Sequence, residues 1–232
     1  MSILENVQAV RARIAVACER SGRDASSVRL IAVSKTKPVS DMLEAYAAGC
    51  RDFGENYVQE ILEKDGQLPA DARIHMIGHL QTNKVGKIVD KVAEIHAVDS
   101  LHLAREIEKQ AAKRNIPAVK VLLEVNVAEE ASKFGFAYDE IGDVLAELQG
   151  TCPHLEVLGL MTSAPMTEAP EENRIYFRKL REAAQQNGLR ELSMGMTGDF
   201  EVAVEEGATM VRIGTAIFGA RDYNHSKQAE RP

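Results

Sequence analysis

A lysine stands one residue after an apolar run near the N-terminus, where its amine could react with an aldehyde. Lys35 follows the sequence Leu-Ile-Ala-Val at residues 30–33. An amine at the end of a buried strand is partly removed from water, and this lowers a lysine pKa because it disfavours the ammonium form. A neutral amine can attack an aldehyde and form an imine. From position alone, a solvated lysine at a strand end is the better interpretation.

Two loops near the C-terminus, each with glycine and threonine, predict a site for a phosphate group. The first loop, residues 195–198, contains Thr197, and the second is formed by Gly214 and Thr215. Glycine lets a ligand approach the backbone closely, amides at a helix start donate to an anion, and threonine adds a hydroxyl. In barrels of eight βα units, the loops after the last two strands often bind phosphate. We therefore favour a phosphate site over two ordinary turns.

An arginine and a histidine are further candidates. Arg212 lies in residues 209–213, which we expect to form a strand, and a buried arginine is costly unless it is paired. It could donate to an acceptor on a ligand. Without a ligand, an ion pair with an acid of a neighbouring strand, such as Glu124 or Glu55, is the favoured interpretation. His79 either contacts a ligand or caps a helix, and capping is the more common role.

The composition argues against several other kinds of site. The net charge of −7 disfavours a nucleic-acid partner, because a phosphate-binding face needs clustered Lys and Arg. The histidines show no metal-site spacing with acids or cysteines, so we expect no metal. Three widely spaced cysteines favour a reducing compartment. No run approaches the roughly 20 apolar residues of a membrane span, and no signal peptide is evident, so we expect a cytoplasmic protein without membrane contact.

Short apolar runs that alternate with helical patterns must position these residues. The runs expected to be strands are residues 28–34, 52–54, 74–77, 94–98, 119–127, 155–161, 192–194 and 209–213. Helical patterns lie between them, for example at residues 41–48, 101–113, 138–148 and 171–186. Mostly apolar strands that alternate with helices indicate a parallel sheet covered by helices. Eight units, without a glycine-rich dinucleotide fingerprint after the first strand, favour a closed barrel over an open doubly wound sheet.

An additional helix precedes the eight units. Ser2 and Glu5 fit a capping box, and apolar residues at positions 3, 7, 10 and 14 share one face. No linker or low-complexity segment divides the chain. We therefore predict one α/β domain over residues 1–232, a single (β/α)8 TIM-type barrel with an extra N-terminal helix.

Seven segments, taken in order, resemble the pyridoxal phosphate homeostasis protein family. They are AVSKTKP (32–38), FGENYVQE (53–60), IGHLQTNK (77–84), SKFGF (132–136), GLM (159–161), LSMGMTGDF (192–200) and VRIGTAIFGARDY (211–223). Each is weak alone, but together their order and spacing are specific and cover nearly the whole chain. The resemblance implies a barrel similar to the N-terminal domain of alanine racemase, with pyridoxal 5′-phosphate (PLP) as cofactor.

The resemblance also implies roles for individual residues. Lys35 matches the lysine that forms a Schiff base with PLP, and Arg212 matches the arginine that faces the pyridine nitrogen. Asn56 matches a polar residue near the cofactor. The phosphate-binding positions match Thr197, Gly214 and Thr215. The family usually has serine where Thr197 stands, and because the hydroxyl is kept we expect binding to survive.

The family is linked to PLP homeostasis without an established catalytic reaction. We therefore expect an intracellular carrier or regulator of PLP, with no catalytic residues. The alternative is a weak amino-acid racemase, which needs a base on each face of its substrate. Lys35 could serve one face, but the similar alanine racemases take the opposing tyrosine from a β-rich domain for which this chain leaves no room. A phosphosugar enzyme is a third hypothesis, supported only by the two phosphate-type loops.

Two further lysines bear on the release of PLP. Lys37 would lie on the same side as Lys35 if the strand persists, because strand side chains alternate, and Lys133 ends the sequence EEASK. We hypothesise that either lysine can capture the aldehyde and help PLP leave. PLP-dependent apo-enzymes would be the transient recipients. We expect a monomer, because the similar racemases dimerise through the domain that is missing here.

Overall fold

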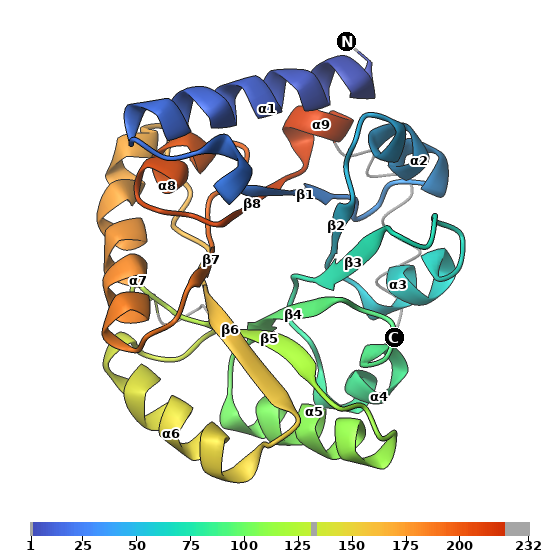
Figure 1. Ribbon diagram of the computed structural model, residues 1–232, viewed down its shortest axis with the longest axis vertical. Coiled ribbons are helices and arrows are strands. Elements are labelled where there is room, and N and C mark those ends of the chain that lie inside the picture. Colours follow the sequence, from blue (N-terminus) through green and yellow to red (C-terminus); the bar gives the residue numbers. More distant parts are fainter. Residues whose placement is uncertain (1, 131–133, 221–232) are drawn as a thin grey trace.

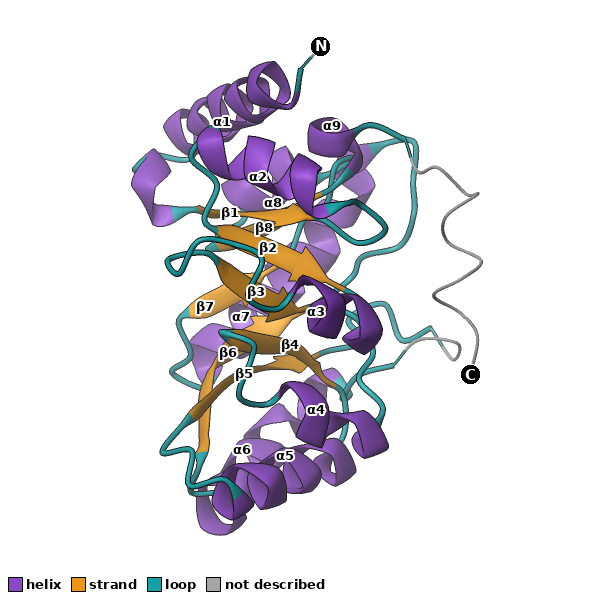
Figure 2. Ribbon diagram, turned by 90° about the vertical axis from the view of Figure 1, so that its right-hand side faces the viewer, coloured by secondary structure: helices purple, strands orange, loops and turns teal. Residues whose placement is uncertain are grey.

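Eight parallel strands form a closed barrel in chain order, as predicted. The computed structural model describes residues 2–130 and 134–220. The strands are β1 (Arg29–Val33), β2 (Asp52–Glu55), β3 (Arg73–Met76), β4 (Glu94–Val98), β5 (Val119–Glu124), β6 (Leu155–Met161), β7 (Glu191–Ser193) and β8 (Met210–Ile213). We call the end of the barrel at the C-terminal ends of the strands the mouth, and the opposite end the base. All strands point toward the mouth (Figure 2).

Helices surround this barrel (Figure 1). They are α1 (Ile3–Arg20), α2 (Val39–Ala47), α3 (Val58–Lys64), α4 (Val85–Ile88), α5 (Leu101–Lys113), α6 (Ile141–Thr151), α7 (Arg174–Gln186), α8 (Phe200–Glu205) and α9 (Thr215–Phe218). Short 3₁₀ helices occur at Ala25–Ser27, Thr82–Lys84, Tyr138–Glu140 and Pro170–Asn173. Among the described helices, none is both long and apolar enough to cross a bilayer.

The first strand closes the barrel. Ile31 lies opposite Asp52 of β2 on one side and opposite Arg212 of β8 on the other. Because side chains alternate along a strand, Ile31 points into the barrel while its neighbours point toward the helices. The interior is filled by a small apolar cluster, separate from the larger core that contains the residues facing the helices. The interior cluster consists of Ile31, Ala97, Leu122, Met161 and Met210.

The predicted strands and helices are confirmed, with differences at their ends. The short second strand is real and extends one residue further, to Glu55. The predicted strand 119–127 ends earlier, at Glu124. The chain turns there because the Asn126 side chain accepts a hydrogen bond from the Glu130 amide at 3.2 Å and donates to the Glu130 carbonyl at 2.8 Å. A side chain that bonds the local backbone competes with the strand ladder.

The additional N-terminal helix packs across the outside of the barrel. Ser2 and Glu5 form the predicted capping box, and Val7, Val10 and Ile14 are buried. Helix α1 contacts α2, α8 and α9 (Figure 1). The Asn6 side chain donates to the Ile217 carbonyl in α9 at 2.8 Å. The start of the chain is therefore fastened to the segment that follows the last strand.

Candidate functional site

The loop after β1 carries Lys35 into the mouth of the barrel. Ile31 fills the barrel interior, and Val33 and Lys35 both line the mouth. Ser34 points the other way, and its hydroxyl donates to Glu55 Oε1 at 2.6 Å. The Lys35 side chain is half-buried, and not the solvated side chain that its position alone favours.

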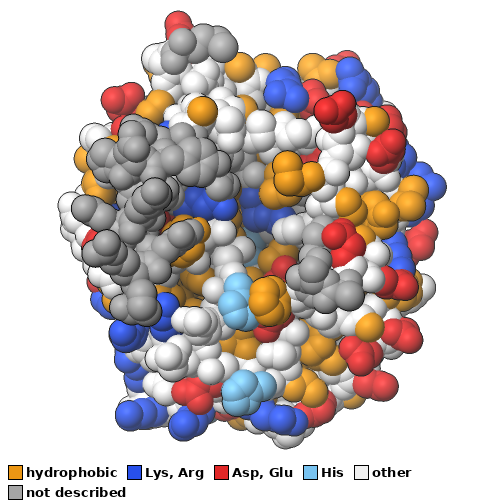
Figure 3. All heavy atoms as spheres, turned by 180° about the vertical axis from the view of Figure 1, so that it is seen from behind, with side chains coloured by type: hydrophobic (Ala, Val, Ile, Leu, Met, Phe, Trp, Pro, Cys, Tyr) orange, Lys and Arg blue, Asp and Glu red, His pale blue; other side chains and the backbone are white. Residues whose placement is uncertain are grey.

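All six residues predicted for the site line one pocket in the mouth, with a cavity volume of about 310 Å³. They are Lys35, Asn56, Thr197, Arg212, Gly214 and Thr215. Lys37 also lines it, so the pocket has three cations and, among the described residues, no acid. Figure 3 looks at this end of the barrel and shows Lys and Arg side chains gathered in a hollow. The pocket is therefore positively charged although the whole chain carries a net charge of −7. Local positive charge suits an anionic ligand.

Hydroxyls and a carbonyl hold Arg212 in the wall of the pocket. Its Nη1 donates to Ser193 Oγ at 2.7 Å, and its Nη2 donates to the Thr162 carbonyl at 2.8 Å. Burial lowers the pKa of Arg212 to about 10, although Glu124 and Asp199 oppose that shift. The predicted ion pair with Glu124 or Glu55 is wrong for the described residues, because hydroxyl and carbonyl groups satisfy this guanidinium instead.

Asn56 begins the loop after β2 and lines the pocket. Its Oδ1 is buried and has no hydrogen-bond partner among the described residues. The loop is packed closely against the next one, since a Cβ at Gly78 would lie 2.7 Å from the Asn56 carbonyl oxygen. Glycine at position 78 therefore permits the approach that brings Asn56 to the pocket. A buried polar atom without a partner is costly, so this oxygen fits a site that binds a polar ligand.

The loop that contains Thr197 is fixed by its neighbours. Gly195 has a φ of +91°, and a Cβ there would lie 2.6 Å from the Ala203 Cβ. The Met196 amide donates to Asp199 Oδ1 at 2.7 Å. On the pocket side, a Cβ at Gly198 would meet nothing within 4 Å. Gly198 is exposed and lines the pocket together with Thr197, so the backbone of this loop is accessible to a ligand.

Lys37 lines the same pocket, but not for the predicted reason. The strand does not persist to this residue, because β1 ends at Val33 and Thr36 adopts a left-handed φ of 63°. The Lys37 ammonium donates to the Phe218 carbonyl at 2.9 Å and to the Ala220 carbonyl at 3.2 Å. Lys37 therefore ties the loop after β1 to the end of α9. Lys133 lies outside the described residues.

The predicted capping role of His79 is wrong, because the cap of the nearby 3₁₀ helix is Gln81. His79 is not among the residues that line the mouth pocket. Its Nδ1 lies 2.8 Å from Asp99 Oδ2, and its ring stacks on Phe134 with centroids 4.1 Å apart. The histidine therefore forms a polar pair on the rim instead of a helix cap.

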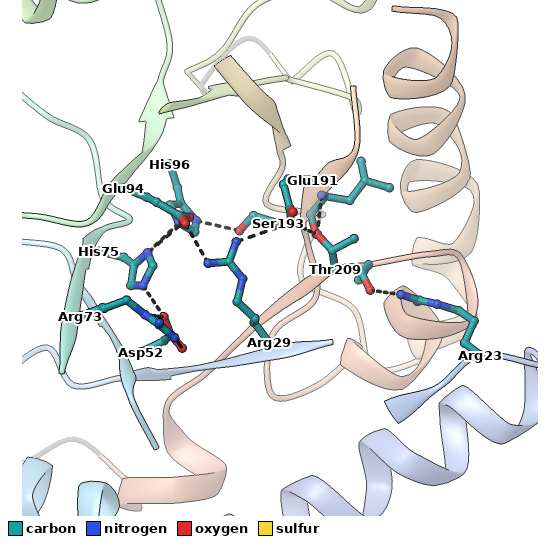
Figure 4. Close-up of polar contacts among 12 residues, drawn as sticks. Arg23, Arg29, Asp52, Arg73, His75, Glu94, His96, Glu191, Ser193 and Thr209 are labelled. Carbon is teal, nitrogen blue, oxygen red and sulfur yellow. Dashed lines mark hydrogen bonds and ion pairs between the residues drawn. The ribbon is translucent and has the colours of Figure 1, made fainter. Parts of the chain in front are cut away.

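Sequence reasoning missed a group of charged residues at the base (Figure 4). His75, Glu94 and His96 are buried, and their ligand atoms are close enough to hold a metal ion, so the prediction that the histidines lack metal-site spacing with acids is wrong. The missed signal is the spacing of Glu94 and His96, two residues apart on one face of β4. Each imidazole also contacts a further side chain through one ring nitrogen. His75 Nε2 lies 2.8 Å from Asp52 Oδ1, and His96 Nδ1 lies 3.0 Å from Ser193 Oγ.

Arginines complete the group at the base. Arg29 donates to Glu94 Oε1 at 2.8 Å, and Arg73 donates to both carboxylate oxygens of Asp52 at 2.8 and 2.7 Å. Burial alone would raise the pKa of Asp52, but hydrogen bonds from His75 and Arg73 hold it well below its usual range. Burial would likewise raise the pKa of Glu94, yet contacts with His75, His96 and Arg29 keep it very low.

Residues 6–222 match the family described as alanine racemase, N-terminal domain. The pyridoxal phosphate homeostasis protein of Aquifex aeolicus is 46% identical over 230 residues, which cover 96% of this chain and 100% of that protein. This chain belongs to the pyridoxal phosphate homeostasis protein family. The solved structure of PipY from Synechococcus elongatus PCC7942, with PLP bound, is 36% identical in sequence and superimposes with a TM-score of 0.80. The match covers 94% of the present chain and 100% of the PipY chain.

A more distant structure shares the fold of this pyridoxal phosphate homeostasis family member. Alanine racemase from Corynebacterium glutamicum is 19% identical, with a TM-score of 0.67. The match covers 92% of this chain and 62% of the racemase chain. The barrel is therefore of the type found in alanine racemase.

Proposed function

We propose that this protein binds PLP in the mouth pocket, with the cofactor joined to Lys35 as a Schiff base. The observation that carries the proposal is the pocket lining, in which a half-buried lysine lies with two more cations and, among the described residues, no acid. PLP supplies an aldehyde that reacts with amines, and its phosphate is an anion. The PLP-bound structure of PipY, 36% identical to this chain, supports the same occupant.

The lining residues divide into two groups by their chemistry. Thr197 supplies a hydroxyl, and Gly214 and Thr215 supply backbone amides and a second hydroxyl, which together suit the phosphate. Arg212 can only donate, so facing the ring nitrogen it leaves that nitrogen without a proton. A ring without that proton withdraws electrons less strongly. Asn56 offers the oxygen that the described residues leave without a partner.

The function supported by this arrangement is PLP homeostasis, in which the protein carries the cofactor or regulates its supply. Relatives such as the Aquifex aeolicus protein bear that name. PLP-dependent apo-enzymes are the proposed transient recipients, and we propose that no residue of this chain is catalytic. We place the protein in the cytoplasm as a monomer, and its free cysteines, Cys18, Cys50 and Cys152, fit a reducing compartment.

Reductive trapping tests the proposed site. The parent protein, Lys35→Ala and the control Lys84→Ala are incubated with PLP and reduced with borohydride, and the labelled peptide is located by mass spectrometry. Lys84 is exposed and does not line the pocket. We expect the pyridoxyl adduct on Lys35 in the parent and in Lys84→Ala, and no site-specific adduct in Lys35→Ala. Label spread over surface lysines of the parent would contradict the proposal.

Hydrogen exchange separates a carrier from a racemase. PLP-loaded protein is incubated with alanine in deuterated water, and exchange at Cα is followed by NMR. A carrier gives exchange no faster than free PLP does. Exchange at enzymatic rates, lost in Lys35→Ala, would instead establish the weak racemase.

Lys37 is a testable part of PLP release. Its ammonium is bound to two carbonyls in and after α9, and these bonds must break before it can capture the aldehyde. We propose that Lys37 and Lys133 assist transfer to an apo-enzyme. Equal transfer rates in the parent, Lys37→Ala and Lys133→Ala would rule this role out.

A further inference from the structure

A buried lysine lies directly behind the loop that carries Lys35. Lys64 is the last residue of α3, and its side chain is 7% exposed. Its ammonium donates to the Ser34 carbonyl at 3.0 Å, to Glu55 Oε1 at 2.8 Å and to Glu60 Oε2 at 2.7 Å. All three donor positions of this ammonium are therefore used within one small buried network.

Glu60 holds the other side of the same loop. Its Oε2 accepts the Thr36 amide at 2.7 Å, in addition to the Lys64 ammonium. Thr36 has a φ of 63°, a left-handed conformation that a residue with a Cβ adopts only when its surroundings impose it. The hydrogen bond to Glu60 is one such restraint.

The two contacts bracket the predicted PLP lysine. The Ser34 carbonyl lies before Lys35 and the Thr36 amide lies after it, and one Lys64–Glu60 pair binds both. The Ser34 hydroxyl adds a third contact, to Glu55. The peptide groups on both sides of Lys35 are thereby attached to α3.

Stability alone does not account for this network. Burying ionised groups is costly, and well-packed apolar residues often stabilise a protein as much or more. One oxygen of Glu55 and one of Glu60 have no hydrogen-bond partner among the described residues. Burial raises the pKa of Glu55 to about 7, although Lys64 and Ser34 oppose that shift. A costly network with its contacts on one loop fits a role in holding that loop.

We propose that Lys64 and Glu60 are positioning residues, which fix the backbone on both sides of Lys35 so that its amine enters the pocket. The inference rests on the proposed function, because the Lys35 amine needs a fixed position only if it reacts with PLP. Reacting groups must be placed closely for bond formation, and small displacements reduce reaction strongly. Lys37 lies two residues away in the same pocket and becomes the competing amine when the loop is released.

The test compares Lys64→Met and Glu60→Gln with the parent and with a control on the same helix, Glu63→Gln, whose side chain is exposed. Circular dichroism and thermal unfolding without PLP establish that each variant folds. PLP titration then gives the dissociation constant, and borohydride trapping with peptide mass spectrometry gives the share of adduct on Lys35 and on Lys37.

We expect the parent and Glu63→Gln to carry the adduct on Lys35. In Lys64→Met the dissociation constant rises about tenfold or more, and part of the adduct moves to Lys37. Glu60→Gln also raises the dissociation constant and the share of adduct on Lys37, but by less, because the glutamine side-chain oxygen still accepts the Thr36 amide. A loss of stability alone would not change which lysine is labelled.

Folded variants that bind PLP like the parent, with all label on Lys35, would overturn the inference and leave the proposed function intact. If Lys64→Met fails to fold, Glu60→Gln decides the question, since it has nearly the same volume as the parent residue. Absence of label from Lys35 in the parent itself would overturn the proposed function, and the inference with it.

Discussion

The two ends of the barrel use charge in different ways. At the base, each buried acid meets an arginine, with Arg29 on Glu94 and Arg73 on Asp52. At the mouth, three cations line a pocket that has no acid among its described residues. Buried acids at the base need their arginine partners because an unpaired buried charge is costly, whereas an excess of one sign attracts a ligand of the opposite sign. At the base the charges pair directly with one another, whereas the cations of the mouth share a pocket lined by no acid among the described residues.

One hydroxyl connects the two ends. Ser193 Oγ accepts from Arg212 Nη1 at 2.7 Å and lies 3.0 Å from His96 Nδ1. Arg212, which lines the pocket, is therefore held by a residue that also holds the group at the base. Substitutions can separate what each end contributes to PLP affinity and to the free energy of unfolding.

The largest effect is expected for Arg212→Met. Removing a charged donor that faces the ligand weakens PLP binding about tenfold to a hundredfold. The Ser193 hydroxyl and Thr162 carbonyl also lose a buried partner, which lowers the free energy of unfolding by about 1–3 kcal/mol. PLP titration and urea unfolding measure the two effects, with the exposed Arg20→Met as control. Unchanged PLP affinity would show that the guanidinium serves only the fold.

Asp52→Asn tests the base in isolation. Asp52 accepts from Arg73 and pairs with His75, so the substitution weakens a buried charge network and lowers the free energy of unfolding by about 2 kcal/mol. PLP affinity and the labelling of Lys35 stay the same. Loss of PLP binding without loss of stability would refute the division between base and mouth.

Individual acids at the two ends differ in the pH dependence of their contribution to stability. Asp52 and Glu94 have lowered pKa values, so the folded state binds their protons more weakly, and their stabilisation is lost as pH falls below about 4. Near the mouth, burial raises the pKa of Glu124 to about 6, with Asp99 adding to the shift. The folded state then binds the Glu124 proton more tightly, and its contribution to stability falls as pH rises from about 4.5 to 6.

Urea unfolding across this pH range measures both effects. Glu124→Gln reduces the fall in stability above about pH 4.5, whereas Asp52→Asn reduces the fall in acid. If the free energy of unfolding fell equally above about pH 4.5 in Glu124→Gln and in the parent, burial of the Glu124 carboxyl would not be the cause of that fall.

The smallest effect is expected at Thr197. Thr197→Ser keeps the hydroxyl and leaves PLP affinity unchanged, whereas Thr197→Ala loses one hydrogen bond, about 1 kcal/mol or a few-fold in affinity. Phosphate competition against PLP, measured by absorbance, reports the same difference. Equal affinity in all three proteins would remove Thr197 from the proposed phosphate site.

Hydrophobic patterning predicts most of this fold. Strand β4 and helix α5 lie at the residues expected for them, because alternating and helical periodicities are properties of local sequence. The end of β5 was not predictable in that way. Val125 and Val127 continue the apolar pattern, but Asn126 turns the chain through its own side chain. The left-handed turn at Thr36 after β1 likewise involves Glu60, which is distant in sequence and accepts the Thr36 amide.

The candidate site was predictable where family resemblance supplied the residues, and less so from physical reasoning alone. Sequence position alone favoured a solvated lysine at Lys35 and an ion pair at Arg212. In the structure both residues line the pocket. The partners of Arg212 are hydroxyl and carbonyl groups of other strands, and no local pattern reveals them. His75 and Glu94 were missed because the contact between them depends on the pairing of β3 with β4.

The hydrogen bond from Asn6 to Ile217 gives the first helix an influence on the pocket from outside the barrel. Helix α9, which α1 braces, begins with Thr215 of the pocket wall. Removing the first helix, or substituting Asn6, is therefore expected to change ligand affinity through α9 without touching any lining residue. A purification tag is best placed away from this end when binding constants are to be compared.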